Sequence, residues 1–176
     1  MLNIAFLFGT LSGLITIVAI IGSIVIGLDH HGGVSEYIGY LIMIIALSMI
    51  FFGVKRYRDR ELGGVIKFMP AFLTGLGITV VAGVIYVIVW EVYLAATGVD
   101  TFIEVYAKAM ADGAQAKHLS AAELAEEMKG IEYFRANYPN PLFRLPMTFI
   151  EIFPVGVLIA LISAAILRNP KAVPAT

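Results

Sequence analysis

Two glutamates lie within long apolar segments of this 176-residue chain, and their position makes them candidates for chemistry. Glu91 directly follows a segment, 68–90, that contains no charged residue, and Glu151 is the one charge between 145 and 167. A charge within a bilayer is costly, so a carboxylate retained there is a candidate functional group. A carboxylate pair with raised pKa values suits proton transfer.

Asp29, His30 and His31 form a second group of candidates, directly after the first apolar segment. Imidazole and carboxylate ligands suit zinc or iron, so these residues would form a metal site if they met Glu91 and Glu151 at one level of the membrane. Adjacent histidines point to different faces of a regular element, which argues against one metal held by both. We therefore expect no metal and no other cofactor.

The two glutamates also have a structural interpretation. Either side chain would be satisfied by interfacial water or by an ion pair with Arg144. Glu151 lies about 140° around a helix from Gly156, at ~100° per residue, and so falls away from the small-residue face of its segment. The pattern favours interfacial or ion-paired glutamates over a proton or ligand site.

The elements that must position these groups are apolar and long. The chain is 60% hydrophobic and 14% charged, whereas a soluble domain has about 45–50% apolar and 25% charged residues. A bilayer core takes about 20 apolar residues per helix. We predict an all-α membrane protein, one membrane domain over 1–176, with a bundle of four transmembrane helices at 3–28, 36–54, 66–95 and 143–167.

The connector between the third and fourth helices, 96–142, has the composition of a soluble segment. Ser120 and Glu123 have the spacing of a capping box. The turns that follow place apolar residues near one face of a helix: Leu124, Met128, Ile131 and Phe134. Such a stripe predicts a helix that lies on the membrane surface or covers the bundle.

Basic residues set the expected orientation. Five of them lie between 55 and 67, and none lies between 29 and 36. By the positive-inside rule this predicts that both termini are cytoplasmic and that the connector is extracytoplasmic. With 12 Lys and Arg against 13 Asp and Glu, the chain offers no basic surface for nucleic acid.

Small residues and a proline are expected to pack the bundle, because helices in lipid associate through close approach. The expected packing residues are Gly9, Gly13, Gly75, Gly83, Pro154 and Gly156. The favoured interpretation is contact within one chain, and the alternative is a homodimer through the Gly9 and Gly13 face. Pro154 is predicted to kink the fourth helix.

Aromatic residues gather where the third helix ends and the second begins. Tyr86, Trp90 and Tyr93 precede the connector, and Tyr37 and Tyr40 lie on the same side of the membrane. Such residues are typical of interfacial belts, so we expect anchors rather than a ligand cage.

Two segments together resemble the DUF4199 family of bacterial integral membrane proteins. One is LGGVIKF at 62–68, which enters a Gly-rich helix ending at Trp90 and Glu91, and the other is EIFPVGVL at 151–158, continuing as LISAAILR at 161–168. The resemblance covers essentially the whole chain. It implies four transmembrane helices in a bacterial membrane and carries no assigned activity.

The sequence thus favours a protein of the bacterial inner membrane without catalytic residues, in a structural, regulatory or partner-binding role. Its expected partners are the lipid bilayer and a membrane protein or a further copy of the chain. The alternative is a small transporter or proton-linked carrier that uses Glu91 and Glu151. An intramembrane or lipid-acting enzyme ranks third, because the sequence lacks a nucleophile-and-base constellation. The motifs H-E-x-x-H and G-x-S-x-G and Gly-rich phosphate loops are also absent from the chain.

Overall fold

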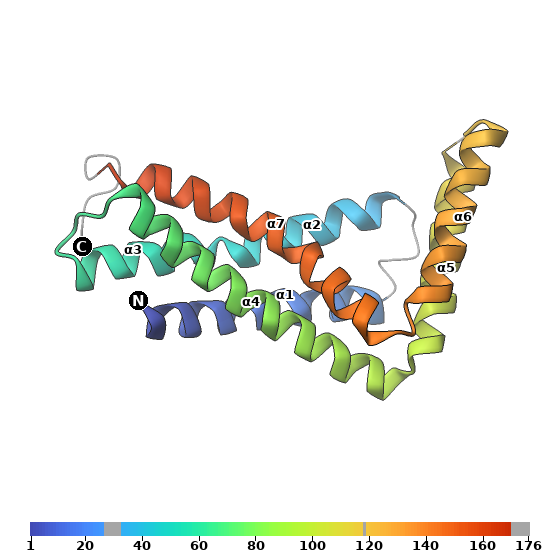
Figure 1. Ribbon diagram of the computed structural model, residues 1–176, viewed down its shortest axis with the longest axis horizontal. Helices are drawn as coiled ribbons and strands as arrows, with labels where there is room; N and C mark the ends of the chain where they lie inside the picture. The colour runs from blue at the N-terminus through green and yellow to red at the C-terminus, as the bar shows by residue number, and fades with distance from the viewer. Residues whose placement is uncertain (27–32, 118, 170–176) are drawn as a thin grey trace.

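The computed structural model describes residues 1–26, 33–117 and 119–169, and in these ranges every regular element is a helix (Figure 1). The helices are α1 (Leu2–Val25), α2 (Gly33–Leu47), α3 (Met49–Glu61), α4 (Phe68–Thr97), α5 (Val99–Ala116), α6 (Ala121–Asn137) and α7 (Pro141–Leu167).

Four segments are long and apolar enough to cross a membrane, which confirms the number predicted from the sequence. They are Leu2–Val25, Tyr37–Glu61, Phe68–Thr97 and Pro141–Leu167. A bilayer core of about 30 Å takes roughly 20 helical residues, so each segment is sufficient by length.

The second segment differs from the predicted helix at 36–54. It is interrupted at Ser48, whose hydroxyl donates to the Ile45 carbonyl at 2.6 Å and whose N–H is shared between the carbonyls of Ile44 and Ile45. Helix α3 then continues through Glu61, because the basic residues after 54 are good helix formers and extend the helix instead of forming a loop.

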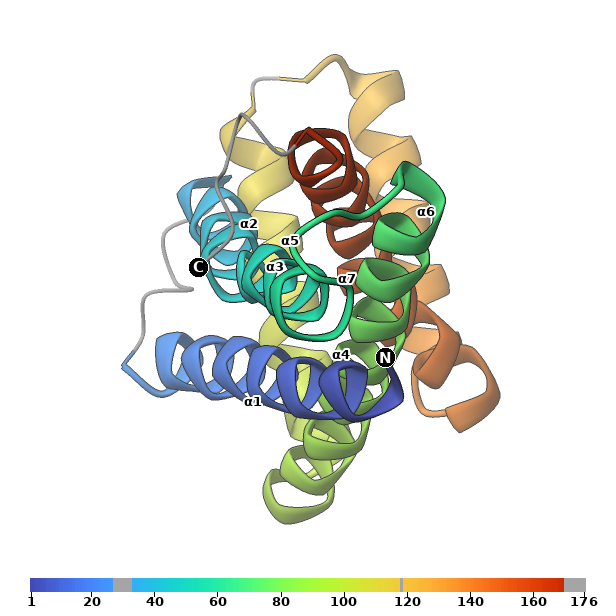
Figure 2. The ribbon, with the colours of Figure 1, turned by 90° about the vertical axis from the view of Figure 1, so that its left-hand side faces the viewer.

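Helix α4 is the centre of the bundle. It packs along α1 on one side and along α7 on another, and α3 contacts all three of these helices. Figure 2, a view close to the bundle axis, shows α3 between α1 and α7. The longest helix, α4, is therefore the one against which α1, α3 and α7 pack.

Glycines bring these helices close together, and they lie where the sequence analysis expected packing. An added Cβ at Gly9 would meet Val81, and one at Gly13 would meet the Ala82 carbonyl of α4 at 2.6 Å. The face that the dimer alternative required is thus filled within the chain. Three further glycines lie between α4 and α7: Gly75 against Ala160, Gly83 against Phe149 and Gly156 against Thr79.

Helix α7 begins at Pro141 and contains two further prolines, Pro146 and Pro154, in its interior; it is helical through both. Of these two, only Pro154 was expected from the sequence to pack the bundle and kink the helix. Pro154 is exposed, so its ring is accommodated on the outer surface of the bundle and not in the packed interface.

Helices α5 and α6 form an antiparallel pair, here named the arm, which crosses one end of the bundle (Figure 1). The predicted capping box at the start of α6 is confirmed: the Ser120 N–H donates to a Glu123 carboxylate oxygen at 2.9 Å, and Ser120 Oγ accepts from the Glu123 N–H. The Ser120 hydroxyl also donates to this carboxylate at 2.6 Å, and the bonds from the hydroxyl and the N–H of Ser120 together lower the pKa of Glu123. Helix α6 ends at Asn137, before Pro139.

The opposite end, here named the basic end, joins the start of α1 to the ends of α3 and α7. The amino group of Met1 lies 3.0 Å from a Glu61 carboxylate oxygen. Arg58 is fully buried, and its Nη1 donates to the Leu167 carbonyl at 3.5 Å. Gly63 and Gly64, with φ of 66° and 91°, then turn the chain toward α4.

The close approach of α1 to α4 predicts the effect of adding one methyl group. Gly13→Ala places a Cβ against the backbone oxygen of Ala82, which no side-chain rotation can relieve. We expect a loss of about 1–3 kcal/mol in the free energy of unfolding in detergent, the usual cost of overpacking.

Gly22→Ala is the matched control in the same helix, because nothing lies within 4 Å of its added Cβ. It should leave stability unchanged or raise it by up to about 1 kcal/mol through helix propensity. Equal stability of the two variants would contradict the observed α1–α4 contact.

Candidate functional site

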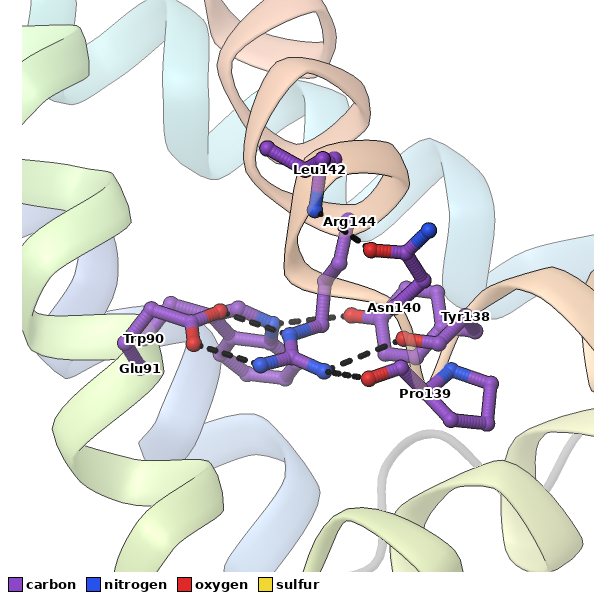
Figure 3. Close-up of polar contacts among 7 residues, drawn as sticks. All are labelled: Trp90, Glu91, Tyr138, Pro139, Asn140, Leu142 and Arg144. Atoms are coloured by element: carbon purple, nitrogen blue, oxygen red, sulfur yellow. Dashed lines mark hydrogen bonds and ion pairs between the residues drawn. The ribbon is translucent and has the colours of Figure 1, made fainter.

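An ion pair between α4 and α7 lies at the arm end of the bundle (Figure 3). Arg144 Nε donates to Glu91 Oε1 at 2.7 Å, and Arg144 Nη2 donates to Glu91 Oε2 at 2.6 Å. The arginine side chain is 6% exposed and the glutamate 29%. This two-point geometry is the strong form of the interaction, because a planar guanidinium matches both carboxylate oxygens at once.

The remaining terminal nitrogen of Arg144 binds the chain that leads out of the arm. Its Nη1 donates to the carbonyl of Tyr138 at 3.0 Å and to that of Pro139 at 3.3 Å. The turn is completed by Asn140, whose side-chain oxygen caps α7 by accepting from the Leu142 N–H at 3.0 Å (Figure 3). A single guanidinium therefore connects α4, α7 and the end of the arm.

Tyr138 makes a second connection to α4. Trp90 Nε1 donates to the Tyr138 hydroxyl at 2.9 Å, and both side chains are buried. Burial raises the pKa of Tyr138 to about 12, so the hydroxyl remains protonated and neutral at physiological pH. This bond satisfies an indole N–H that would otherwise be buried without a partner.

Aromatic rings from α4, α5 and α6 pack around this bond. The centroid distances are 5.0 Å for Trp90 to Phe102, 5.4 Å for Tyr106 to Phe134 and 4.6 Å for Phe134 to Tyr138. Rings at such spacing in offset or edge-to-face arrangements attract beyond the burial of their area. The root of the arm is thus held by an apolar cluster as well as by polar bonds.

This cluster changes the interpretation of the aromatic residues of α4. Tyr86 and Trp90 are 2% and 6% exposed within the chain, so they are not interfacial anchors as expected. Tyr37 and Tyr40 are exposed, at 79% and 45%, and stay compatible with an interfacial belt. Trp90 contacts Phe102 and Tyr138 at the root of the arm, and the Tyr86 hydroxyl is bonded to Glu151 of α7.

Glu151 lies in a different environment from Glu91. It is exposed on α7 and accepts a hydrogen bond from the hydroxyl of the buried Tyr86 at 3.3 Å. The two glutamates therefore have different partners, Arg144 for Glu91 and Tyr86 for Glu151, and they do not form a carboxylate pair with each other. Glu91 is ion-paired with Arg144, which the favoured interpretation of the sequence named beside interfacial water as a partner for the glutamates.

Asp29, His30 and His31 lie outside the described residues. Among the residues that the structure does describe, no group of three His, Cys, Asp or Glu side chains is arranged to hold a metal ion.

Sequence reasoning missed the contribution of Tyr138 and the joining of three elements by Arg144. The available signal was local: an indole directly precedes Glu91, and a Tyr-Pro-Asn-Pro turn directly precedes the segment that contains Arg144. Nothing in a helical period relates residues that are 48 or 53 positions apart.

Comparison with known proteins gives the family. A family model described as a protein of unknown function, DUF4199, matches residues 7–169. The chain belongs to the DUF4199 family. The resemblance expected from the segments at 62–68 and 151–158 is confirmed. Searches of curated proteins and of solved structures each found no match.

In this DUF4199 protein, we expect Arg144 and Glu91 to be coupled in their effect on stability. Arg144→Gln leaves the Glu91 carboxylate and two carbonyls without a charged donor, and breaking one side of a largely buried pair costs about 3 kcal/mol. We expect that loss in chemical unfolding in detergent, together with faster amide exchange in α5 and α6. In the double variant Glu91→Gln, Arg144→Gln, the loss should be smaller than the sum of the two single losses.

Arg135→Gln is the control, since Arg135 pairs with Glu104 across the exposed side of the arm at 3.3 Å. An exposed pair contributes below about 1 kcal/mol. Additive losses at positions 91 and 144, or equal losses at 144 and 135, would show that the pair does not hold the arm.

Proposed function

We propose that this protein is a non-enzymatic partner-binding protein of the bacterial inner membrane, and that the arm binds a neighbouring membrane protein. The observation that carries the proposal is the contrast between the two ends of the arm. Its root is held to α4 and α7 by Arg144, Tyr138 and the aromatic cluster. Its tip extends sideways past the four membrane-crossing segments (Figure 1).

A rigid arm across the end of the bundle reaches over whatever lies beside the protein in the membrane. Fixing a binding element before it meets its partner reduces the entropy lost on association. The outer half of the arm also presents apolar surface, since Met128, half-way along α6, is 42% exposed and Ala121, Ala122 and Ala125 nearer the tip are exposed.

The charge of the arm supports a protein over the lipid surface as its partner. Residues 99–137 contain seven Asp or Glu and four Lys or Arg, and the Glu126 side chain is 79% exposed. Helices that bind anionic lipid are rich in Lys and Arg on the polar face. An acidic arm is instead complementary to a basic protein surface.

The orientation is part of the same proposal: the basic end in the cytoplasm and the arm outside. Lys55, Arg56, Arg58, Arg60, Lys67 and Arg168 all lie at or beside the basic end. The positive-inside rule assigns a short, basic end of this kind to the cytoplasm, while segments as long as the arm influence orientation less.

A proton-linked carrier has less support. Its carboxylates would have to gain and lose protons, whereas Glu91 is held in a two-point ion pair with Arg144. Of the two carboxylates that the carrier would use, only Glu151, which is bonded to Tyr86, is outside an ion pair with Arg144. An enzyme would require a nucleophile and base in contact, which the described contacts of Glu91 and Glu151 do not supply.

Photocrosslinking in native membranes tests partner binding. A photoreactive residue at position 128 should give a protein adduct of discrete mass, whereas one at the lipid-facing position 158 should give lipid adducts. Glu126→Lys should weaken the protein adduct by reversing a charge at the tip, and Asp100→Lys at the root should not. Lipid adducts alone at position 128 would contradict the proposal.

Cysteine accessibility tests the orientation, because the chain contains no cysteine of its own. In intact cells, an impermeant maleimide should label Glu126→Cys, and it should label Arg168→Cys only after permeabilisation. The reverse pattern would place the arm in the cytoplasm and overturn the orientation.

A further inference from the structure

An open pocket of about 430 Å³ lies on α3 at the basic end, far from the arm. It is lined by Phe52, Lys55, Arg56, Asp59 and Arg60. We propose that this basic pocket binds the phosphate of an anionic phospholipid headgroup. The proposal concerns the opposite end of the molecule and does not rest on partner binding by the arm.

The one acidic residue of the pocket is directed toward other groups of the chain. Asp59 Oδ2 accepts from Lys55 Nζ at 2.6 Å, and Oδ1 accepts from Arg58 Nε at 2.6 Å. Its side chain is 4% exposed, so the carboxylate is neutralised below the surface and does not repel an anion. It also holds Lys55 at the edge of the pocket.

Two cations of the pocket have no acidic partner among the described residues. Arg56 and Arg60 lie one helical turn apart on α3 and are both exposed. Neither forms a hydrogen bond or ion pair within the part of the chain that the structure describes. Like charges four residues apart on a helix destabilise it, and an anion bound between them removes that repulsion. Guanidinium groups match phosphate oxygens with two parallel bonds.

The position of the pocket favours a lipid over a free phosphate. Helix α3 changes at one point from the apolar sequence MIFFGV, 49–54, to the charged sequence KRYRDRE, 55–61. Phe52 lies on the apolar side of this boundary, and it is 54% exposed. A ligand with a phosphate for the arginines and an acyl chain for Phe52 fits both halves, and a phospholipid has that chemistry.

Native mass spectrometry of the full chain in neutral detergent provides the test. Phosphatidylglycerol should bind more tightly than phosphatidylcholine. The double variant Arg56→Gln, Arg60→Gln should raise the apparent Kd for phosphatidylglycerol by about tenfold. Lys117→Gln with Lys129→Gln is the matched control, because it removes two exposed cations from the arm. This control should leave the Kd unchanged.

Two further measurements identify the ligand. Excess inorganic phosphate should not displace the lipid, and Phe52→Ser should weaken lipid binding while the protein keeps its unfolding temperature. Displacement by inorganic phosphate would reassign the pocket to a free anion and overturn the lipid proposal. Equal lipid affinity of the double-arginine variant and its arm control would overturn the site itself.

Discussion

The ion pair between Arg144 and Glu91 is the contact on which the arm end of this protein depends. A largely buried charge without a partner would be costly, and each group reduces that cost for the other through two parallel hydrogen bonds. The same guanidinium binds the carbonyls of Tyr138 and Pro139, so the turn from α6 into α7 is fixed by the charge that α4 requires. The position of the arm follows from that geometry.

The rest of the bundle is held by close approach rather than by charge. Lipid tails solvate leucine as well as a helix does, so apolar surface alone does not bring membrane helices together. Glycines have no side chain where α4 meets α1 and α7, so the helix backbones approach closely. Dispersion between the closely packed helices then supplies the attraction that apolar surface alone does not. Polar groups at these interfaces satisfy themselves locally, as Thr16 does by donating to the Ser12 carbonyl at 2.8 Å.

The two ends of the molecule differ in charge and in how that charge is held. At the arm, acidic residues predominate, and several form exposed pairs such as Lys129 with Glu126. At the basic end, Arg58 is buried and directs Asp59 inward, leaving Arg56 and Arg60 on the surface. The proposed binding of a basic protein surface by the arm and that of anionic lipid by the basic end both depend on this difference in charge.

The sequence by itself determined the four segments that are long and apolar enough to cross a membrane, the capping box of α6 and the family, because hydropathy, capping and motif are properties of neighbouring residues. It also named Arg144 as one of two ways to satisfy Glu91. Only the tertiary structure decided between them, and only it brought Trp90 to Tyr138 and left Glu151 with Tyr86. These contacts join residues separated by tens of positions, so they depend on how α4, α7 and the arm pack. Helical periodicity records which face a residue occupies, and it carries no information on which helix lies opposite.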